Sequence, residues 1–273
     1  MHERLSSGRF YGETLRRYES AGLTLTESVY LPGTRLPKHS HTNSYFCLTL
    51  RGAYREVYGS RQRGCNPSTL VFHPADEIHA NEFLDKGGHL FRLELPAAWA
   101  ERVNPHSSVL RNAADFTGGP LVSMVTKLYS ECYQPDSVSP LVIEGLALEI
   151  IGELSRRQTF KRKAGPPRWV NQAEEFLHAH FAEKLNPTAI SLLLDVHPVH
   201  LARGFRQAHG CTMGEYLRQL RIEIASRYLA SSDTPIAEIS TLVGFADQSH
   251  FSRNFKRLTR MTPAQYRAIF CGR

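Results

Sequence analysis

Basic and polar side chains recur in two similar segments of the C-terminal region. LARGFRQAHGCTMGEYL (201–217) aligns with FSRNFKRLTRMTPAQYR (251–267), fifty positions further along the chain. The matching positions are Arg203, Phe205, Arg206, Thr212 and Tyr216 in the first segment and Arg253, Phe255, Lys256, Thr262 and Tyr266 in the second. An arginine can bond to both O6 and N7 of a guanine, and basic side chains also pair with phosphates. The repeat therefore predicts two surfaces that contact nucleic acid.

Each copy has a short apolar helix, a tight turn and a second helix with basic residues, which is the helix-turn-helix pattern. Phe251 and Phe255 are four positions apart and should share the buried face of the second helix, as should Leu201 and Phe205 in the first copy. For any single arginine on the opposite face, the alternative is a solvated surface, but equivalent arginines in both copies favour contacts with double-stranded DNA. The candidate residues are Val199, Ala202, Arg203, Arg206, Gln248, Ser249, His250, Arg253, Lys256 and Arg257.

The basic residues differ in where they stand on these helices. Arg203 and Arg253 lie in the half that would enter a groove, so we expect them to contact bases. Arg206, Lys256 and Arg257 are better placed for phosphates, which position a complex without reading its sequence.

The run IAEISTLVGFADQSHFSRNFKRLTRMTPAQYR (236–267) resembles the C-terminal signature of the AraC/XylS family of bacterial transcription regulators. The resemblance covers about 168–270. It implies two helix-turn-helix units joined by one long helix, expected over 212–230. The base contacts that it implies come from Val199, Ala202, Arg203, Gln248, Ser249, His250 and Arg253.

Three positions depart from the family pattern. Arg260 replaces the usual glycine before Thr-Pro, and Asp195 stands in the first turn where glycine is common. His197 replaces the usual serine before the first recognition helix, which should weaken the N-cap of that helix. These departures predict a less regular first unit.

The C-terminal segment should be helical almost throughout. Pro235 and Pro263 each follow a threonine, which is typical of a capped helix start, and Gly210 and Gly244 stand where a helix should end. The expected helices span about 168–183, 187–194, 198–208, 212–230, 235–243, 247–258 and 263–270.

Two histidines in the N-terminal half belong to a spaced motif. The segment Gly33-x5-His39-x-His41-x3-Tyr45-x6-Gly52 resembles the first cupin motif, with Tyr45 where metal-binding cupins place glutamate. In the segment that resembles the second motif, the matching residues are Pro74 and His79, whereas Asp76 replaces a glycine and Phe83 an asparagine. The resemblance implies a small cupin-like β-barrel, as arabinose-sensing relatives of the C-terminal family have.

Three imidazoles from neighbouring strands could bind a divalent metal such as zinc, copper or iron and leave a position open for a ligand. The metal candidates are His39, His41 and His79, and Cys47 would face the same side as Tyr45 and could be a fourth ligand. The alternative is that these side chains line a polar effector pocket or only end their strands. A small-molecule effector would bind in the barrel interior. The pocket candidates are His39, His41, Tyr45, Phe72, His79 and Phe91.

Strands and then helices should position these residues. Between about 22 and 95, alternating or β-branched runs such as TLVFH are separated by Gly, Pro and Asn, which favours a sandwich or small barrel. Between about 120 and 157 the apolar spacing becomes helical. These connector helices would pack on the barrel wall or form a homodimer interface. The basic, proline-containing stretch 155–168 then predicts a linker.

The two halves of the chain differ in net charge. Residues 1–160 hold 17 basic and 17 acidic side chains, whereas residues 161–273 hold 16 and 9 and thus carry the whole net charge of +7. A basic half beside a neutral half favours a polyanion-binding module joined to something else.

The five cysteines show no CxxC spacing, so neither a disulfide framework nor a zinc finger is indicated. The N-terminus has no apolar signal region, and no run approaches about eighteen apolar residues. We expect a soluble, cytoplasmic protein with no membrane partner.

We therefore expect an α+β protein with two domains. Residues 1–160 would form a cupin-like β-barrel sensor with a helical connector (about 120–157), and residues 168–273 an all-α double helix-turn-helix domain. The expected function is ligand-responsive, sequence-specific regulation of transcription without enzymatic activity. An effector would shift how the connector presents the two units, changing promoter occupancy or contact with RNA polymerase.

Two alternatives stay open. A metal-dependent cupin enzyme tethered to DNA would hold stoichiometric metal and turn over a small substrate. A constitutive DNA-binding protein with a purely structural barrel would regulate without a ligand.

Overall fold

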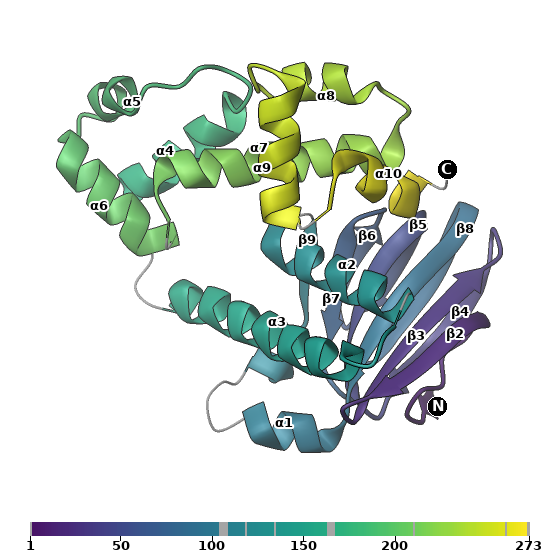
Figure 1. Cartoon of the computed structure of the whole chain (residues 1–273). Coiled ribbons are helices and arrows are strands. Elements are labelled where there is room, and N and C mark those ends of the chain that lie inside the picture. The colour runs from purple at the N-terminus through teal and green to yellow at the C-terminus, as the bar shows by residue number, and fades with distance from the viewer. Residues whose placement is uncertain are drawn as a thin grey trace.

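The computed structural model describes residues 2–103, 109–117, 119–133, 135–162, 167–209, 211–259 and 261–271. A large β-sheet forms most of the N-terminal part, and helices α4 to α10 form the C-terminal part (Figure 1). The expected α+β class, with an N-terminal sheet followed by an all-helical region, is confirmed at this level.

The described strands form one sheet with the hydrogen-bonded order β1-β4-β8-β5-β7-β9. Strand β3 joins β2 to β8, and β6 pairs with β5. This order does not return to its first strand, so the closed barrel expected from the cupin resemblance is not formed by these strands. The strands are β1 (Glu3–Leu5), β2 (Glu13–Ser20), β3 (Leu23–Tyr30), β4 (Arg35–His41), β5 (Ser44–Tyr58), β6 (Arg61–Cys65), β7 (Thr69–His73), β8 (His79–Leu95) and β9 (Ala114–Thr117).

Strands β5 and β8 are longer than the sequence suggests, because glycines expected to end strands lie inside them. The two strands pair antiparallel along most of their length, with register shifts close to Gly52. Gly52 has φ +72° and lies opposite Gly88. A Cβ atom on Gly52 would lie 2.1 Å from the carbonyl oxygen of Gly87. Glycine is therefore required where the two strands cross at close range.

Alternation along the strands gives the sheet two different faces. One face carries apolar side chains such as Phe46, Leu48 and Leu93, which belong to the main core cluster with α2 and α3. The opposite face carries Tyr45 and Cys47, which belong to a separate buried cluster. The helices therefore cover one face while the other encloses polar groups.

The connector helices lie close to their expected positions. Their apolar positions are buried, including Val122 and Val125 on α2 and Ile150 on α3. Helix α3 continues beyond residue 155, so the expected linker begins later than predicted, and residues 163–166 lie outside the described part of the chain. The elements here are α1 (Ala97–Val103), the 3-10 turn η1 (Val109–Arg111), α2 (Gly119–Tyr133) and α3 (Ser139–Arg162).

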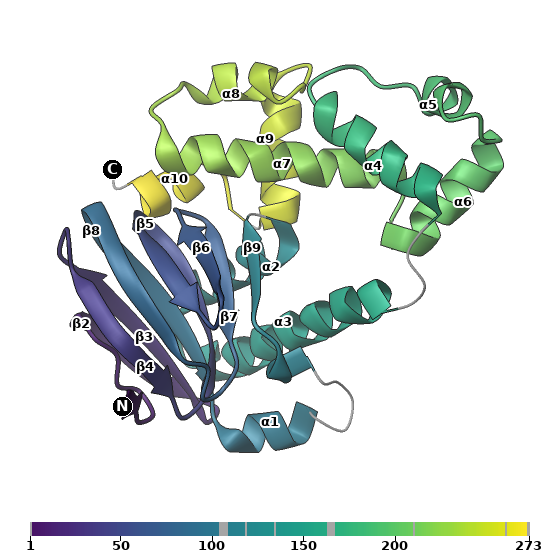
Figure 2. The same ribbon diagram turned by 180° about the vertical axis from the view of Figure 1, so that it is seen from behind.

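The C-terminal helices match the predicted ranges to within a few residues, apart from an earlier end to the first. The long helix α7 has α4, α5 and α6 at one end and α8 and α9 at the other (Figures 1 and 2). We call α5 with α6 the first unit and α8 with α9 and α10 the second unit. The helices are α4 (Arg168–Ala179), α5 (Pro187–Leu193), α6 (Pro198–His209), α7 (Met213–Ser231), α8 (Ile236–Leu242), α9 (Gln248–Thr259) and α10 (Pro263–Cys271).

Local sequence signals explain most of these helix ends. Thr212 and Glu215 form a reciprocal capping box at the start of α7. Asp195 takes the left-handed conformation, φ +52°, that glycine commonly supplies at this turn. Helix α8 instead begins after Pro235 with no side-chain cap, so the cap expected there is absent. Gly210 and Arg260 lie outside the described residues.

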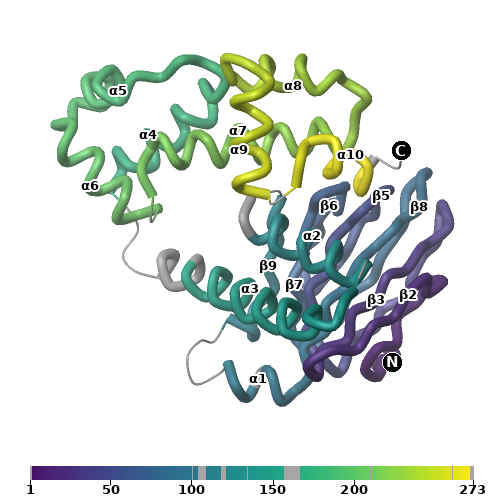
Figure 3. Tube along the Cα trace, in the orientation of Figure 1, coloured from purple at the N-terminus to yellow at the C-terminus, as the bar shows by residue number. Residues whose placement is uncertain are grey.

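The two units differ in how they are buried. Phe251, Phe255 and Tyr266 belong to the same continuous core cluster as the sheet face and α2. The first unit has its own cluster around Leu201 and Phe205. The second unit is therefore packed against the N-terminal part, as the adjacency of α9 and α10 to α2 and β5 shows (Figure 3).

Gly244 provides a stability test of the second unit. It has φ +82°, and an added Cβ atom would lie 2.4 Å from the carbonyl oxygen of Ala182. We expect Gly244→Ala to lower the free energy of unfolding by about 2 kcal/mol or more, measured by urea denaturation. The control is Gly214→Ala in α7, where the new Cβ would meet only the Arg218 side chain at 3.7 Å. Equal effects of the two substitutions would contradict this account.

Candidate functional site

The second recognition helix, α9, presents a polar face to solvent. Asp247 accepts a hydrogen bond from the backbone N–H of His250 at 2.7 Å and so caps the helix. Phe251 and Phe255 are fully buried, as their four-residue spacing predicts. The exposed residues of this face are Gln248, Ser249, His250, Arg253, Lys256 and Arg257.

The first recognition helix, α6, is arranged in the same way. Nδ1 of His197 accepts from the backbone N–H of Val199 at 3.3 Å, so the imidazole occupies the capping position of the usual serine. Leu201 and Phe205 are fully buried. The exposed residues of this face are Val199, Ala202, Arg203 and Arg206. All ten predicted DNA-contact residues are thus exposed, and their contact with DNA stays a prediction.

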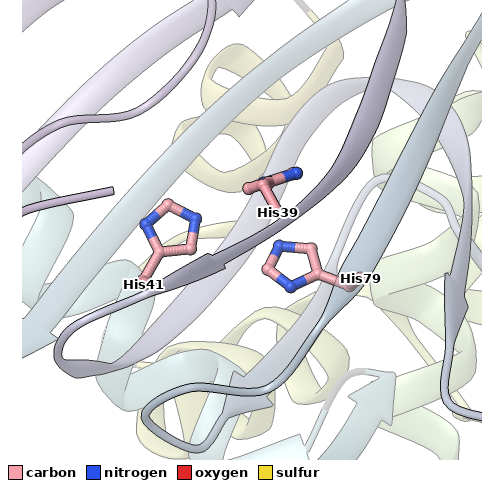
Figure 4. A group of neighbouring side chains, drawn as sticks. All are labelled: His39, His41 and His79. Carbon is pink, nitrogen blue, oxygen red and sulfur yellow. The ribbon is translucent and has the colours of Figure 1, made fainter. Parts of the chain in front are cut away.

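A histidine cluster lies on the polar face of the sheet. His39 and His41 come from β4 and His79 from β8, and their rings lie together (Figure 4). The ring centroids of His39 and His79 are 4.3 Å apart, and all three side chains are at most 3% exposed. One nitrogen from each lies within 4.8 Å of the others, so the sequence prediction that these residues converge is correct.

Hydrogen bonds fix two of these rings. Nδ1 of His39 donates to the carbonyl oxygen of Pro37 at 2.8 Å, and Nδ1 of His79 donates to that of Glu77 at 3.0 Å. Because a carbonyl can only accept, each Nε2 keeps its lone pair. Burial lowers the pKa of both His39 and His79 to about 4 and also lowers the pKa of His41. The three imidazoles are therefore neutral at pH 7, which is the form that binds metals.

The cluster lines a small cavity, whose non-atom space of about 310 Å³ includes the gaps between side chains and its opening to solvent. Phe10 and Tyr11 from the N-terminal segment lie against His41 and His39, with ring centroids 4.6 and 4.9 Å apart. The N-terminal segment thus forms part of the cavity wall.

Two predicted pocket residues lie elsewhere. Phe72 and Phe91 are in the main core cluster on the helix-covered face of the sheet, and neither lines this cavity. Both stand one residue away in the strand from positions that do face it, His73 and Arg92. Because side chains alternate along a strand, a shift of one residue moves a side chain to the opposite face.

The structure also adds residues that sequence reasoning missed. Glu56 is 1% exposed and forms an ion pair with Arg63 at 2.5 Å. His73 lies between Glu56 and Glu77, at 3.3 and 2.9 Å. His73 reaches the cavity because the register of β7 with β5 places it opposite Tyr45. This pairing cannot be read from the sequence alone.

The second unit and the sheet are linked by specific polar contacts. The guanidinium of Arg51 on β5 donates to the carbonyl oxygens of Ile269 and Ala268 near the end of α10, at 3.0 and 3.1 Å. The hydroxyls of Ser68 and Tyr266 share a buried hydrogen bond of 2.7 Å. The strand that carries Tyr45 and Glu56 into the cavity therefore also holds the second unit.

The sequence is similar to known proteins in the region of these helices. Residues 190–269 match a family model described as a helix-turn-helix domain. The bifunctional transcriptional activator/DNA repair enzyme AdaA of Bacillus subtilis (strain 168) is 33% identical over 101 residues, which are 37% of this chain and 48% of that protein. The arabinose operon regulatory protein of Escherichia coli (strain K12) is 26% identical over 234 residues, 81% of this chain and 79% of that protein.

Among solved structures, the C-terminal domain of AraT, a response regulator from Geobacillus stearothermophilus, is 32% identical and covers 38% of this chain and 87% of its own, with a TM-score of 0.37. Residues 190–269 are therefore a helix-turn-helix domain. The printed names of both curated relatives describe transcription regulators. The match spans about half the length of AdaA. In the described residues, no helix is long and apolar enough to cross a membrane.

The exposed face of α9 leads to a prediction about base reading. We expect Arg253→Ala to cost about 1–3 kcal/mol at one base pair and to relax specificity there, because it removes a contact to a base edge. Lys256→Ala should weaken binding to all sequences alike and reduce the salt dependence, because it removes a phosphate contact. Titrations against single-base variants of a bound site at several salt concentrations would measure both effects. Identical behaviour of the two variants would refute the assignment of Arg253.

The neutral histidines generate a prediction about pH. An unfolded histidine titrates near pH 6.5, whereas folded His79 has a pKa of about 4. Between these values the unfolded chain binds more protons, so stability falls as the pH falls. We expect the free energy of unfolding of EDTA-treated protein to decrease from pH 7 to pH 5. His79→Gln should make this slope shallower by up to about 1.4 kcal/mol per pH unit. An unchanged slope would show that His79 is not held neutral by the fold.

Proposed function

We propose that this protein is a ligand-responsive DNA-binding regulator of transcription and that the histidine-lined cavity is its effector site. In this proposal residues 1–160 form the sensor domain and residues 168–273 form the DNA-binding domain with two reading units. The ten exposed residues of α6 and α9 contact double-stranded DNA, with Arg203 and Arg253 reading bases. The cupin-like character of the sensor rests on the histidine spacing and on the convergence of His39, His41 and His79.

The proposal rests on one observation: strand β5 both lines the cavity and binds the last turn of α10. Tyr45 and Glu56 line the cavity near the two ends of this strand, and Arg51 between them binds the last turn of α10. Helix α2 packs on the opposite face of the same sheet and also contacts α9. A ligand that favours one arrangement of β5 or α2 would change how firmly the second unit is docked. Such a shift requires different ligand affinities for the two arrangements.

Dimerisation is part of the same proposal. Leu141 and Leu148 on α3 are one heptad apart and are 74% and 38% exposed. Two such apolar residues on one helix face suit a homodimer interface, which would set the spacing of two DNA half-sites. We place the protein in the cytoplasm, where the regulator would meet DNA and RNA polymerase.

The test is retention of genomic fragments by the full-length protein at near-physiological salt, where non-specific binding is weak. We expect enrichment of a few promoters, and small molecules related to the neighbouring genes should change that enrichment. Uniform, weak retention with every compound would count against specific reading. Specific retention that no compound alters would support the constitutive alternative.

A second candidate role for the cavity is metal binding. The donor set fits a transition metal, because the three imidazoles are neutral and two have their Nδ1–H fixed on backbone carbonyls, leaving Nε2 to bind the ion. His39, His41 and His79 would hold the metal, which would supply a Lewis-acidic position for a ligand. Tyr45, whose hydroxyl lies 3.1 Å from Nε2 of His79, stands where a carboxylate ligand is expected.

Metal analysis of the purified protein distinguishes these roles. Stoichiometric zinc, copper or iron that is lost in His39→Ala and retained in the exposed control His200→Ala would support the metal site. Turnover of a small substrate by the metal-loaded protein would support the enzyme alternative. Absence of metal after purification and after reconstitution with each ion would exclude the metal role and leave the effector role.

A further inference from the structure

Arg92 is a buried cation without an acidic partner. It lies on β8 opposite Cys47, is 5% exposed and lines the histidine cavity. In the described part of the chain, no carboxylate oxygen forms an ion pair with it. Its Nη2 donates to the hydroxyl of Tyr30 at 2.7 Å, whereas its Nη1 is buried without a hydrogen-bond partner.

The surroundings of Arg92 do not neutralise its charge. Burial raises the pKa of Tyr30, Tyr45 and Cys47, so all three are neutral at pH 7. The guanidinium carbon lies 4.4 Å from the centre of the Phe10 ring, which offers only a partial cation–π interaction. Removing a charge from water is costly unless an opposite charge compensates it. Arg92 therefore has no negatively charged group in contact with it among the described residues.

Glu56, the other ionised residue that lines the cavity, has a basic partner. Its carboxylate forms an ion pair with Arg63 at 2.5 Å, and Nη1 of Arg63 also lies 3.9 Å from the carboxylate of Asp115. Glu56 further accepts from the side-chain amide of Asn81 at 2.9 Å. A ligand that completes the cavity should thus carry a single negative charge, since a doubly charged phosphate would leave an excess negative charge close to Glu56.

A second unpartnered atom lies beside the same aromatic ring. Nε2 of His41 is buried with no hydrogen-bond partner, and the His41 ring packs on Phe10 with centroids 4.6 Å apart. Phe10 thus contacts both the guanidinium of Arg92 and the imidazole of His41, each of which has a nitrogen without a hydrogen-bond partner. A carboxylate has two oxygens, each able to accept a hydrogen bond.

We propose that the cavity binds a small monocarboxylate, with one oxygen paired to Arg92, the other accepting from Nε2–H of His41, and the organic part against Phe10 and Tyr30. This assignment rests on the proposed role of the cavity as an effector site and names the class of effector. Neutral sugars and amides fit less well, because they would leave the guanidinium uncompensated.

The test uses EDTA-treated full-length protein at constant ionic strength, with butyrate and benzoate as probes. Butyramide and benzamide, which match their shapes without charge, and inorganic phosphate are the comparison compounds. We expect calorimetric titration to show at least about tenfold tighter binding of a carboxylate than of its amide, because charge-assisted hydrogen bonds are the stronger ones. Equal affinities within each pair, binding of phosphate alone, or no binding by any probe would overturn the proposal.

Variants separate a binding role of Arg92 from a structural one. Arg92→Met should weaken carboxylate binding by at least about tenfold and leave the thermal stability of the ligand-free protein equal or higher, because an uncompensated buried charge is removed. Arg55→Met, on the exposed side of β5, is the matched control and should bind like the wild type. Unchanged carboxylate binding by Arg92→Met would contradict the proposal. If Arg92→Met fails to fold, the comparison of carboxylates with amides on the wild type decides the question alone.

These experiments distinguish a failure of the proposed carboxylate site from a failure of the proposed regulatory role. Carboxylate binding that leaves the retention of every promoter unchanged would count against the effector role and would leave the carboxylate site intact. Carboxylate-independent promoter control by another ligand, with no carboxylate bound at all, would overturn the site and leave the regulatory role.

Discussion

Alternation of side chains along β5 and β8 is the constraint on which the rest of this structure depends. These two strands pair over most of their length, so each presents one row of residues to the helices and the other to the cavity. Phe46 and Leu48 anchor the helical layer, while Tyr45 and Cys47 between them in sequence face the polar interior. Cavity and helix packing are therefore built from the same two strands and cannot be altered independently.

Burial on the polar face sets the electrostatics of the cavity. Desolvation disfavours charge, which keeps the histidines neutral and confines ionised groups to pairs such as Glu56 with Arg63. Arg92 is the exception, because a guanidinium stays protonated even when buried. In a low-dielectric environment such an imbalance makes the cavity selective for an anion, and it leaves the ligand-free protein less stable than an apolar arrangement would be.

The sequence predicted those parts of the fold that local signals determine. The helix start at Thr262 follows from capping chemistry, and the burial of Phe251 and Phe255 follows from their spacing. Convergence of the three histidines was also predictable from their motif. Strand pairing was not, because register depends on residues far apart in the chain. Because the register was unknown, Phe72 and Phe91 were assigned to the wrong face of the sheet. For the same reason His73, Glu56 and Arg92 were missed.

The two helix-turn-helix units differ in what stabilises them, and this difference bears on regulation. The first unit is packed around its own cluster at Leu201 and Phe205, so it depends little on the sheet. The core of the second unit is continuous with the sheet and α2, and Arg51 and Ser68 add polar contacts. In the proposed regulation, a change in the N-terminal part acts on the second unit directly, and α7 links that unit to the first. Because the proposed binding mode places both units on one DNA duplex, a small change in the docking of one would alter binding by the pair.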